Sequence, residues 1–543
     1  MKTLWIPIVL TVSFAPAMLR AQTFPRVPVP PGNPITTSKA LLGKALFWDE
    51  QMSPSKTMAC GTCHMPTAGG SDVRTRLPGA RHPGRDRRFG TADDVLGSPG
   101  VVEAGANASY TYSALFGLDR QVTERRAMPV INAAFERLQF WDGRATGRFV
   151  DPNDGRTVLL QFGAALESQA SAPPVNPVEM SHFGQKWADI ARRIAGSKPL
   201  ALASGIPVAL RAFIGTRSYP DLFVAAFGSK AVTPARIVMA IATYERTLIS
   251  NQSRFDQFVG GDRRALTPTE QAGLNRFNRV GCARCHRGPL LTDHSFANTG
   301  VRPSNEDPGR QNVTNRFADR GRFRVPGLRN VALRAPYFHN GRFATLNDVM
   351  DFYARGGDVR ENLDRRMRRF RLSPTDRNQI VAFLQTLTDP RVRAGLPPFD
   401  RPKLSTETAM PWLYGRGTSG TGGSVPAAVA FEPASLGNAT MSLGVQDALG
   451  GQPAVLAFDL QPSLGGRVFA DLRIHLRLSA GFFIVPVGVL RGSGAGNGWT
   501  STFFQVPANA TLRNQKIYGQ WLVGDPAGQL GLTSSEAFGL RLF

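Results

Sequence analysis

The chain has 543 residues, which is too long for one core of ordinary size, so two to four domains are expected. Hydrophobic residues make up 42% of it, which excludes a disordered protein. The 64 Lys and Arg residues outnumber the 40 Asp and Glu residues and give a net charge of +24, yet no nucleic-acid recognition motif accompanies this charge. We therefore expect no nucleic-acid partner, and an acidic redox partner or plain solvation would each account for the charge.

The chain opens with a stretch that is typical of a secretory signal. "MKTLWIPIVLTVSFAPAMLRA" carries Lys2, then an apolar run, then small residues up to Ala21. A membrane anchor is the alternative, but the run is short and Pro7 and Pro16 interrupt it. No other stretch is long enough to span a bilayer. We predict that residues 1–21 are a signal peptide and that the protein is exported, either periplasmic or secreted, without a membrane span.

An amphipathic helix is predicted over 38–50, and the first of two cysteine motifs follows it. All 4 Cys residues fall in two copies of one pattern, "MACGTCHMP" (58–66) and "RVGCARCHRGP" (279–289). Cys-x-x-Cys-His is the attachment pattern of c-type haem, in which both thiols bond the porphyrin and the imidazole binds the iron. A thioredoxin-like pair requires no His, and zinc is disfavoured because the two motifs lie far apart in the chain. We predict two covalently bound haem c groups, on Cys60, Cys63 and His64 and on Cys282, Cys285 and His286.

Helix signals surround the second motif. "TPTEQAGLNRFNRV" begins with a capping box at Thr267, and the stretch 373–390 repeats this signal at Ser373. Another strong helix is predicted over 235–250, between the two motifs. A helix, a haem motif, a loop and a closing helix are the parts of a cytochrome c domain. We predict a mainly α protein with two such domains, at 22–255 and 256–414.

The composition changes after about residue 415. "GRGTSGTGGS" (415–424) is predicted to be a flexible joint. Short β-type runs such as "AVLAFDL", "RIHLRLSA" and "FFIVPVGVL" follow it, separated by Gly and Pro turns. These runs predict a small all-β, sandwich-like module over 415–543. Within it the alternation of 473–478 places His475 on the polar face of its strand.

From about residue 33 to 390 the chain resembles the bacterial di-haem cytochrome c peroxidases, a family that includes the MauG-type enzymes. Five blocks in the right order carry the resemblance, interleaved with the two haem motifs: "LGKALFWDEQMS", "MPVINAAFERLQFWDGRA", "ESQASAPPVNPVEM", "FRVPGLRNVALRAPYFHNGRFATL" and "DVMDFYARGG". The resemblance implies that hydrogen peroxide reacts at the haem on His64. It implies that Glu179 is the acid–base group, Gln169 a polar neighbour, Pro173 a wall near the iron and Trp141 a relay between the haems.

The sequence does not decide the sixth ligand of either iron. Fourteen residues after His339 the peroxidases proper carry a Met, whereas this chain carries Tyr353, as MauG-type members do; Met350 and Met367 are rivals. A phenolate ligand would lower the reduction potential, and a Met ligand would raise it. At the first haem, the position of the family's distal His is Ala80 here. Either His82 serves after a shift, or the site is open, which we favour.

The resemblance also implies one calcium ion between the haem domains. Asn132 matches its side-chain ligand, and the main-chain carbonyls of Arg334 and Pro336 match the others.

The leading functional prediction is a peroxidase that takes electrons from a small donor protein of the cytochrome c or cupredoxin type. A MauG-like oxidase of a protein or organic substrate is the alternative, which Tyr353 and the absence of a His at position 80 favour. A non-catalytic electron carrier is a third possibility, against which Glu179 and Gln169 argue. A homodimer is a further option that the resemblance implies.

Overall fold

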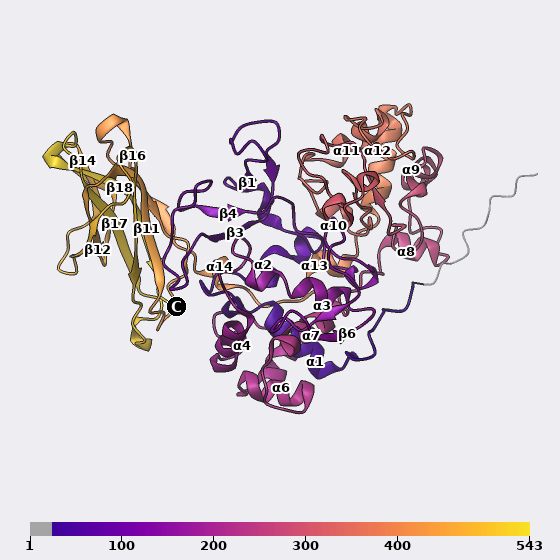
Figure 1. Ribbon diagram of the computed structural model, residues 1–543, viewed down its shortest axis with the longest axis horizontal. Coiled ribbons are helices and arrows are strands. Elements are labelled where there is room, and N and C mark those ends of the chain that lie inside the picture. The colour runs from indigo at the N-terminus through magenta and orange to yellow at the C-terminus, as the bar shows by residue number, and fades with distance from the viewer. Residues whose placement is uncertain (1–23) are drawn as a thin grey trace, which may run out of the picture.

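The computed structural model describes residues 24–543, so the predicted signal peptide lies outside the described residues. Two helical regions occupy the centre and one end of the molecule, and a β-rich region forms the other end (Figure 1). Helices of the first region are α1 (Thr37–Phe47), α2 (Cys60–Cys63), α3 (Ala165–Ala170), α4 (Trp187–Gly196), α5 (Val208–Ile214), α6 (Tyr219–Phe227) and α7 (Pro234–Glu245). Then come α8 (Arg254–Val259), α9 (Pro268–Arg279), α10 (Gln311–Thr314), α11 (Leu346–Ala354), α12 (Pro374–Gln385), α13 (Pro390–Ala394) and α14 (Ser405–Thr408).

The strands of the helical regions are short two-stranded ladders of two to four residues each. They are β1 (Arg81–His82), β2 (Val95–Leu96), β3 (Pro99–Val102), β4 (Arg120–Val122), β5 (Phe149–Val150), β6 (Val158–Leu160), β7 (Phe296–Ala297) and β8 (Phe323–Arg324). Helices therefore carry the packing in these regions, in agreement with the predicted mainly α character.

The predicted helix starts agree with the structure. At Thr267 the side-chain hydroxyl accepts from the Glu270 N–H, so the capping box that opens α9 is confirmed. Ser373 caps α12 in the same way. The first helix, α1, is capped by Thr36 and ends at Phe47, three residues before the end of the predicted range.

The two larger hydrophobic cores of the helical regions are separate from each other. The first surrounds the packed pair α1 and α7 and contains Leu42, Trp48 and Ile241. The second lies between α9 and α12 and contains Phe277 and Phe383. After α12 the chain returns to the first core, where Val392, Phe399 and Leu404 are fully buried. Residues that the sequence assigned to the second unit thus stabilise the first one.

Besides a two-stranded sheet of β13 and β14, the C-terminal region contains two larger sheets that share a core, as expected for a sandwich. One sheet has the order β10-β11-β16 and the other β15-β12-β17-β18-β9. Their bounds are β9 (Trp412–Tyr414), β10 (Ala427–Val429), β11 (Met441–Gly450), β12 (Pro453–Asp459), β13 (Pro462–Phe469), β14 (Leu472–Leu476), β15 (Phe483–Val489), β16 (Gly494–Phe504), β17 (Lys516–Gly524) and β18 (Leu532–Arg541). Leu443 of β11 and the fully buried Trp521 of β17 lie in the shared core. We call this region the β-module.

Two details of the β-module differ from the sequence predictions. The predicted flexible joint is held in place, because Thr418 N–H donates to Ser534 O (2.8 Å) and Thr421 Oγ1 donates to Asp525 Oδ1 (2.5 Å). His475 is only 5% exposed, and its Nε2 lies 3.0 Å from the Arg416 carbonyl oxygen. Both predictions were wrong for one reason: the segment 415–424 packs over β14, and this long-range contact leaves no periodic signal in the sequence.

Within residues 24–543, none of the helices combines the length and the apolar character that crossing a bilayer requires.

Candidate active site

A cavity of about 940 Å³ opens beside the first cysteine motif, within the range of cofactor-binding pockets. Eight residues that the sequence singled out lie on its wall: Cys60, Cys63, His64, His82, Trp141, Gln169, Pro173 and Glu179. They come from segments that are distant in sequence. The fold therefore brings the first attachment motif and its predicted distal residues together.

The first motif is placed by close packing against α1. Cys60 and Cys63 lie on the single turn α2, and a Cβ at Gly61 would come within 2.2 Å of the Trp48 ring, so only glycine fits there. Beyond this turn, the Nδ1 atom of His64 lies 3.1 Å from the Gly70 carbonyl oxygen. This contact holds the imidazole proton on Nδ1 and leaves the Nε2 lone pair free for a metal.

The second motif repeats this arrangement. The Nδ1 atom of His286 lies 3.1 Å from the Leu291 carbonyl oxygen, so its Nε2 is also free. Cys282 packs against the second hydrophobic core. No disulfide joins any two of the four cysteines. Two thiols and one metal-ready imidazole at each motif fit covalently attached haem c.

Glu179 reaches the cavity from a turn built by Asn176. The Asn176 side-chain oxygen accepts from the Val178 N–H (2.9 Å) and the Glu179 N–H (3.1 Å), which fixes the backbone before the carboxylate. Burial raises the pKa of Glu179, and the positive charge of Arg144 on the same wall opposes that rise. A carboxyl group with a raised pKa can both accept and return a proton near neutral pH.

Gln169 and Pro173 flank this carboxylate on the preceding segment. Gln169 lies near the end of α3, and Pro173 begins the short 3-10 turn Pro173–Val175. Both are half-buried and line the cavity. They bring an amide and a rigid apolar ring to the wall that carries Glu179.

Trp141 joins the first cavity to the segment that follows the second motif. Its indole N–H donates to the Arg126 carbonyl oxygen (2.9 Å), and its own carbonyl oxygen accepts from the Arg324 N–H (2.8 Å). The ring packs edge-on against His339, with 6.2 Å between centroids, and His339 stacks on Phe323. Trp141 therefore lies at the junction of the two helical regions.

Three residues were weighed as ligands for the second iron. Tyr353, on α11, lies near the cysteines of its motif, and burial raises the pKa of its phenol. Met350 is fully packed in the second core, and Met367 is half-buried in the loop after α11. The structure thus brings Tyr353 to the second motif.

His82 lies on the cavity wall but is already engaged. Its Nδ1 accepts from the Gly84 N–H (3.1 Å), and its ring packs on Phe116 with 5.9 Å between centroids. Because Nδ1 is an acceptor, a neutral His82 carries its proton on Nε2, where a metal ligand needs a lone pair. In this tautomer the His82 ring offers no lone pair on Nε2 for binding a metal.

The residues at the predicted calcium site do not fit a calcium ion. The Asn132 side chain binds the Ser250 backbone through both Oδ1 (2.9 Å) and Nδ2 (3.1 Å). The Pro336 carbonyl oxygen accepts from the Arg126 guanidinium, and the Arg334 guanidinium is buried close by. Buried positive charge occupies the place where calcium was expected.

Two residues of the cavity were missed from the sequence. Arg144 follows Trp141 in "FWDGRA" and acts on Glu179 through its charge. Glu245 ends α7 and lines the cavity, with one carboxylate oxygen lacking a hydrogen-bond partner, and burial raises its pKa to about 8. A single Glu in the otherwise apolar run "IVMAIATYE" was the available signal for it.

Comparisons with known proteins show which family the chain resembles. The family model for di-haem cytochrome c peroxidases matches residues 37–264. The methylamine utilization protein MauG of Methylorubrum extorquens is 31% identical over 364 residues, which cover 66% of this chain and 81% of that protein. The cytochrome c551 peroxidase of Nitrosomonas europaea is 30% identical over 403 residues, 74% of this chain and 94% of that protein. A crystal structure of a MauG-like protein associated with microbial copper homeostasis has a TM-score of 0.49 at 24% identity, covering 69% of this chain and 96% of that one.

The resemblance predicted from the five sequence blocks is thereby confirmed, since relatives at 30% identity or more are matched over most of their length. The β-module lies outside the range of the family model. The chain belongs to the di-haem cytochrome c peroxidase family.

Proposed function

We propose that this di-haem peroxidase reduces hydrogen peroxide to water in the cavity that carries His64. One observation carries the proposal: the first attachment motif, Glu179 and Gln169 line the same cavity. Haem c held by Cys60, Cys63 and His64 supplies there a redox-active iron for a two-electron reduction. The overall reaction consumes one peroxide, two electrons and two protons and releases two water molecules.

The protein residues of the cavity manage the protons. The Glu179 carboxylate takes a proton from one peroxide oxygen and returns it to the other as the O–O bond breaks. The Gln169 amide orients the peroxide, and the Pro173 ring leaves room for only a small molecule beside it. The raised pKa of Glu179 matches its proton affinity to this exchange.

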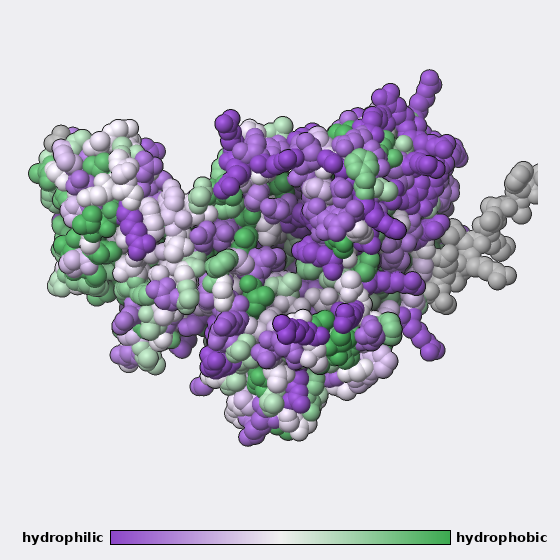
Figure 2. All heavy atoms as spheres, in the orientation of Figure 1, coloured by the Kyte–Doolittle hydropathy of each residue, from purple (hydrophilic) through white to green (hydrophobic). Residues whose placement is uncertain are grey.

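Electrons enter at the second motif in this proposal. The stretch 365–371, after α11, carries four exposed arginines, Arg365, Arg368, Arg369 and Arg371. Figure 2 shows a strongly hydrophilic surface over the region of α9 to α12. A small acidic donor, of the cytochrome c or cupredoxin type, would be attracted to this surface. Trp141, at the junction of the helical regions, then relays electrons toward the cavity.

The same proposal covers the organisation of the chain. Each helical core is a cytochrome c-type domain around one attachment motif, and the protein works after export, as a monomer or a homodimer. The two cores and the predicted signal peptide support this division.

A MauG-like oxidase is the second candidate. The position of Tyr353 beside Cys282 and Cys285 favours it, because a phenolate ligand stabilises oxidised iron. Such an enzyme would withdraw electrons from a protein or organic substrate rather than from a donor cytochrome.

The test is the optical spectrum of the fully oxidised protein before and after one equivalent of peroxide, followed by turnover with a reduced cytochrome c. We expect an immediate spectral change without prior reduction, and then oxidation of the cytochrome at two per peroxide. A spectral change without cytochrome turnover would identify the oxidase. If peroxide leaves the spectrum of both haems unchanged, the protein is an electron carrier and the proposal is overturned.

A further inference from the structure

The segment 103–119, between β3 and β4, forms part of the cavity wall. It contains no helix and no strand of its own, only isolated bridges such as Ser113 with Gly117. Six of its residues line the cavity: Glu103, Tyr112, Ser113, Ala114, Leu115 and Phe116. We call this stretch the wall segment.

The opposite side of the wall segment is bound by the β-module. The Leu118 N–H donates to Gln446 Oε1 on β11 over 2.7 Å, in a buried contact. Ser442 Oγ donates to the Ala108 carbonyl oxygen (3.0 Å). From β16, Ser501 Oγ donates to the Tyr110 carbonyl oxygen (2.9 Å). One sheet of the module thus supplies hydrogen-bond partners along most of the segment.

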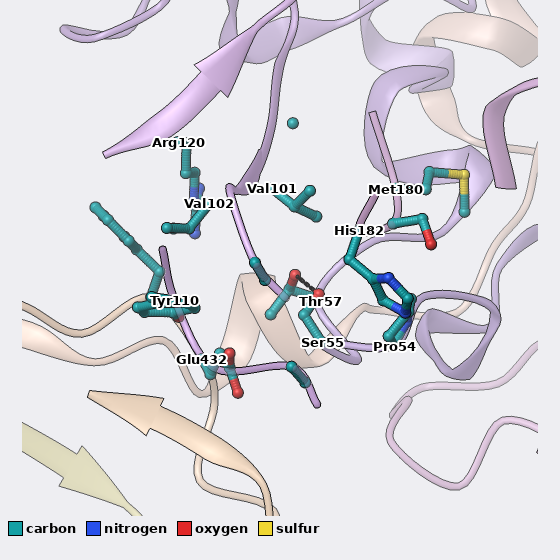
Figure 3. Close-up of a pocket in the computed structure, with 15 residues that line it drawn as sticks. Pro54, Ser55, Thr57, Val101, Val102, Tyr110, Arg120, Met180, His182 and Glu432 are labelled. Carbon is teal, nitrogen blue, oxygen red and sulfur yellow. Dashed lines mark hydrogen bonds between the residues drawn. The ribbon is translucent and has the colours of Figure 1, made fainter. Parts of the chain in front are cut away.

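Side-chain packing reinforces these hydrogen bonds. The Tyr112 ring stacks on Trp499 of β16, with 5.5 Å between centroids and 28° between planes. Leu118 and Tyr110 share a small buried core with Val429 of β10. Nearby, Tyr110 lies beside Glu432 of the module in a small pocket that Arg120 also lines (Figure 3).

The wall segment is also continuous with the backbone that carries Glu179. It follows β3 directly, and in β3 the Val101 N–H donates to the Val178 carbonyl oxygen (3.1 Å). A Cβ at Gly100 would lie 1.8 Å from that same oxygen, so the two chains are in close contact. One layer, the wall segment with β3, therefore separates the module from the backbone that carries Glu179.

A seventeen-residue segment without internal secondary structure gains its order from its neighbours. Here the ordering contacts on the outer side come from β10, β11 and β16. Loss of these contacts would leave buried backbone groups without partners and would let the segment open locally.

We propose that the β-module acts as a clamp that holds the wall segment closed and thereby sets the size of the molecules that enter the cavity. Gln446 and Trp499 are its positioning residues. The proposal deepens the proposed function, since it rests on the cavity being the place where peroxide reacts.

The test compares two glutamines of the β-module in the haem-loaded full chain. Gln446→Leu removes the acceptor of the Leu118 N–H. Gln520→Leu is the control, because Gln520 is also buried but binds only within the module, where it donates to Arg473 O (3.0 Å) and Ser535 O (2.7 Å) and accepts from the His475 N–H (2.8 Å). Trp499→Leu is the second clamp variant, in case Gln446→Leu fails to fold.

Two measurements are made on each variant. Hydrogen exchange of the wall segment is expected to become about tenfold faster in Gln446→Leu and in Trp499→Leu, and to stay unchanged in Gln520→Leu. The second measurement is the rate at which 4-phenylimidazole binds the haem of the cavity, divided by the rate for imidazole. This ratio is expected to rise by a similar factor in the clamp variants alone, because a wider opening admits the bulkier probe.

Neither measurement depends on peroxide turnover, so a failure of the clamp and a failure of the peroxidase proposal are distinguishable. Unchanged exchange in both clamp variants would overturn the proposal. Faster exchange with an unchanged ratio of the two association rates would also overturn it. Equal effects in Gln520→Leu would do the same, because the module would then be only a structural support.

Discussion

The Arg126 guanidinium donates a hydrogen bond to the carbonyl oxygen of Pro336, a residue 210 positions later in the chain. This contact joins the two helical regions at the point where the family resemblance implied a calcium ion. Burial lowers the pKa of Arg126 to about 10, which still leaves the group charged at neutral pH. A fixed cation of the protein thus takes the place of a bound one.

Treatment with a calcium chelator is therefore expected to leave the protein unchanged. Incubation with EGTA should leave the Soret spectrum and the melting temperature unchanged, since Pro336 O already has a cationic partner. Arg126→Met, by contrast, should destabilise the fold by about 1–3 kcal/mol, because it leaves a buried carbonyl oxygen without a donor. Thermal unfolding of both samples is the measurement. A spectral change on chelation that added calcium reverses would restore the calcium site.

Glu179→Gln should lower kcat/KM for peroxide by about 10²- to 10⁴-fold, the usual contribution of one acid–base group. Haem content should stay unchanged, because Glu179 does not belong to either attachment motif. Stopped-flow kinetics of peroxide consumption with matched haem concentrations measure the effect. A variant that retains wild-type kinetics would remove Glu179 from the mechanism.

The pH dependence of the reaction should follow the Glu179–Arg144 pair. The carboxylate form accepts the first proton, so the rate should rise with pH through the raised pKa of Glu179. Arg144→Gln removes the positive charge that keeps the pKa of Glu179 from rising further. The pKa should therefore increase in this variant, and the rate profile should shift to higher pH. Arg148→Gln, an exposed arginine four residues along, is the control and should leave the profile in place. A shift to lower pH in Arg144→Gln would contradict this electrostatic account.

Tyr353→Met should raise the reduction potential of the second haem, on the order of 100 mV, as the phenol is replaced by a thioether. Met350→Leu is the matched control, because Met350 is a core residue of the same helix and the swap nearly conserves its volume. Redox titration followed by absorbance distinguishes the two. Equal potentials in wild type and Tyr353→Met would show that another residue binds this iron.

The exposed arginines after α11 should govern the encounter with the electron donor. Reversal of two charges, Arg368→Glu with Arg369→Glu, should lower kcat/KM for an acidic donor cytochrome and weaken its dependence on salt. Arg192→Glu, on α4 and far from the second motif in Figure 1, serves as the control. Equal losses in both variants would indicate a general charge effect in place of a docking surface.

Several determinants were readable from the sequence alone because they are local. Cys-x-x-Cys-His fixes a covalent attachment site within five residues, and the Thr267 and Ser373 caps set the starts of α9 and α12 through contacts three residues long. Period-2 runs separated by Gly and Pro were sufficient to predict a sandwich-like β-module, and its two larger sheets share one core in the structure. Each of these signals is contained in one short stretch of chain.

Only the tertiary structure decided the contacts between distant stretches. Three contacts join segments whose spacing leaves no periodic pattern in the sequence. They are the Arg126–Pro336 hydrogen bond, the packing of residues 415–424 over His475 and the hydrogen bond between Leu118 and Gln446. The same holds for the return of Phe399 to the first core. Such pairings depend on which surfaces become neighbours after folding, because burial removes water from both partners at once and makes an unpaired polar group costly. The sequence determined the cofactor chemistry of this protein, and the fold decided what surrounds it.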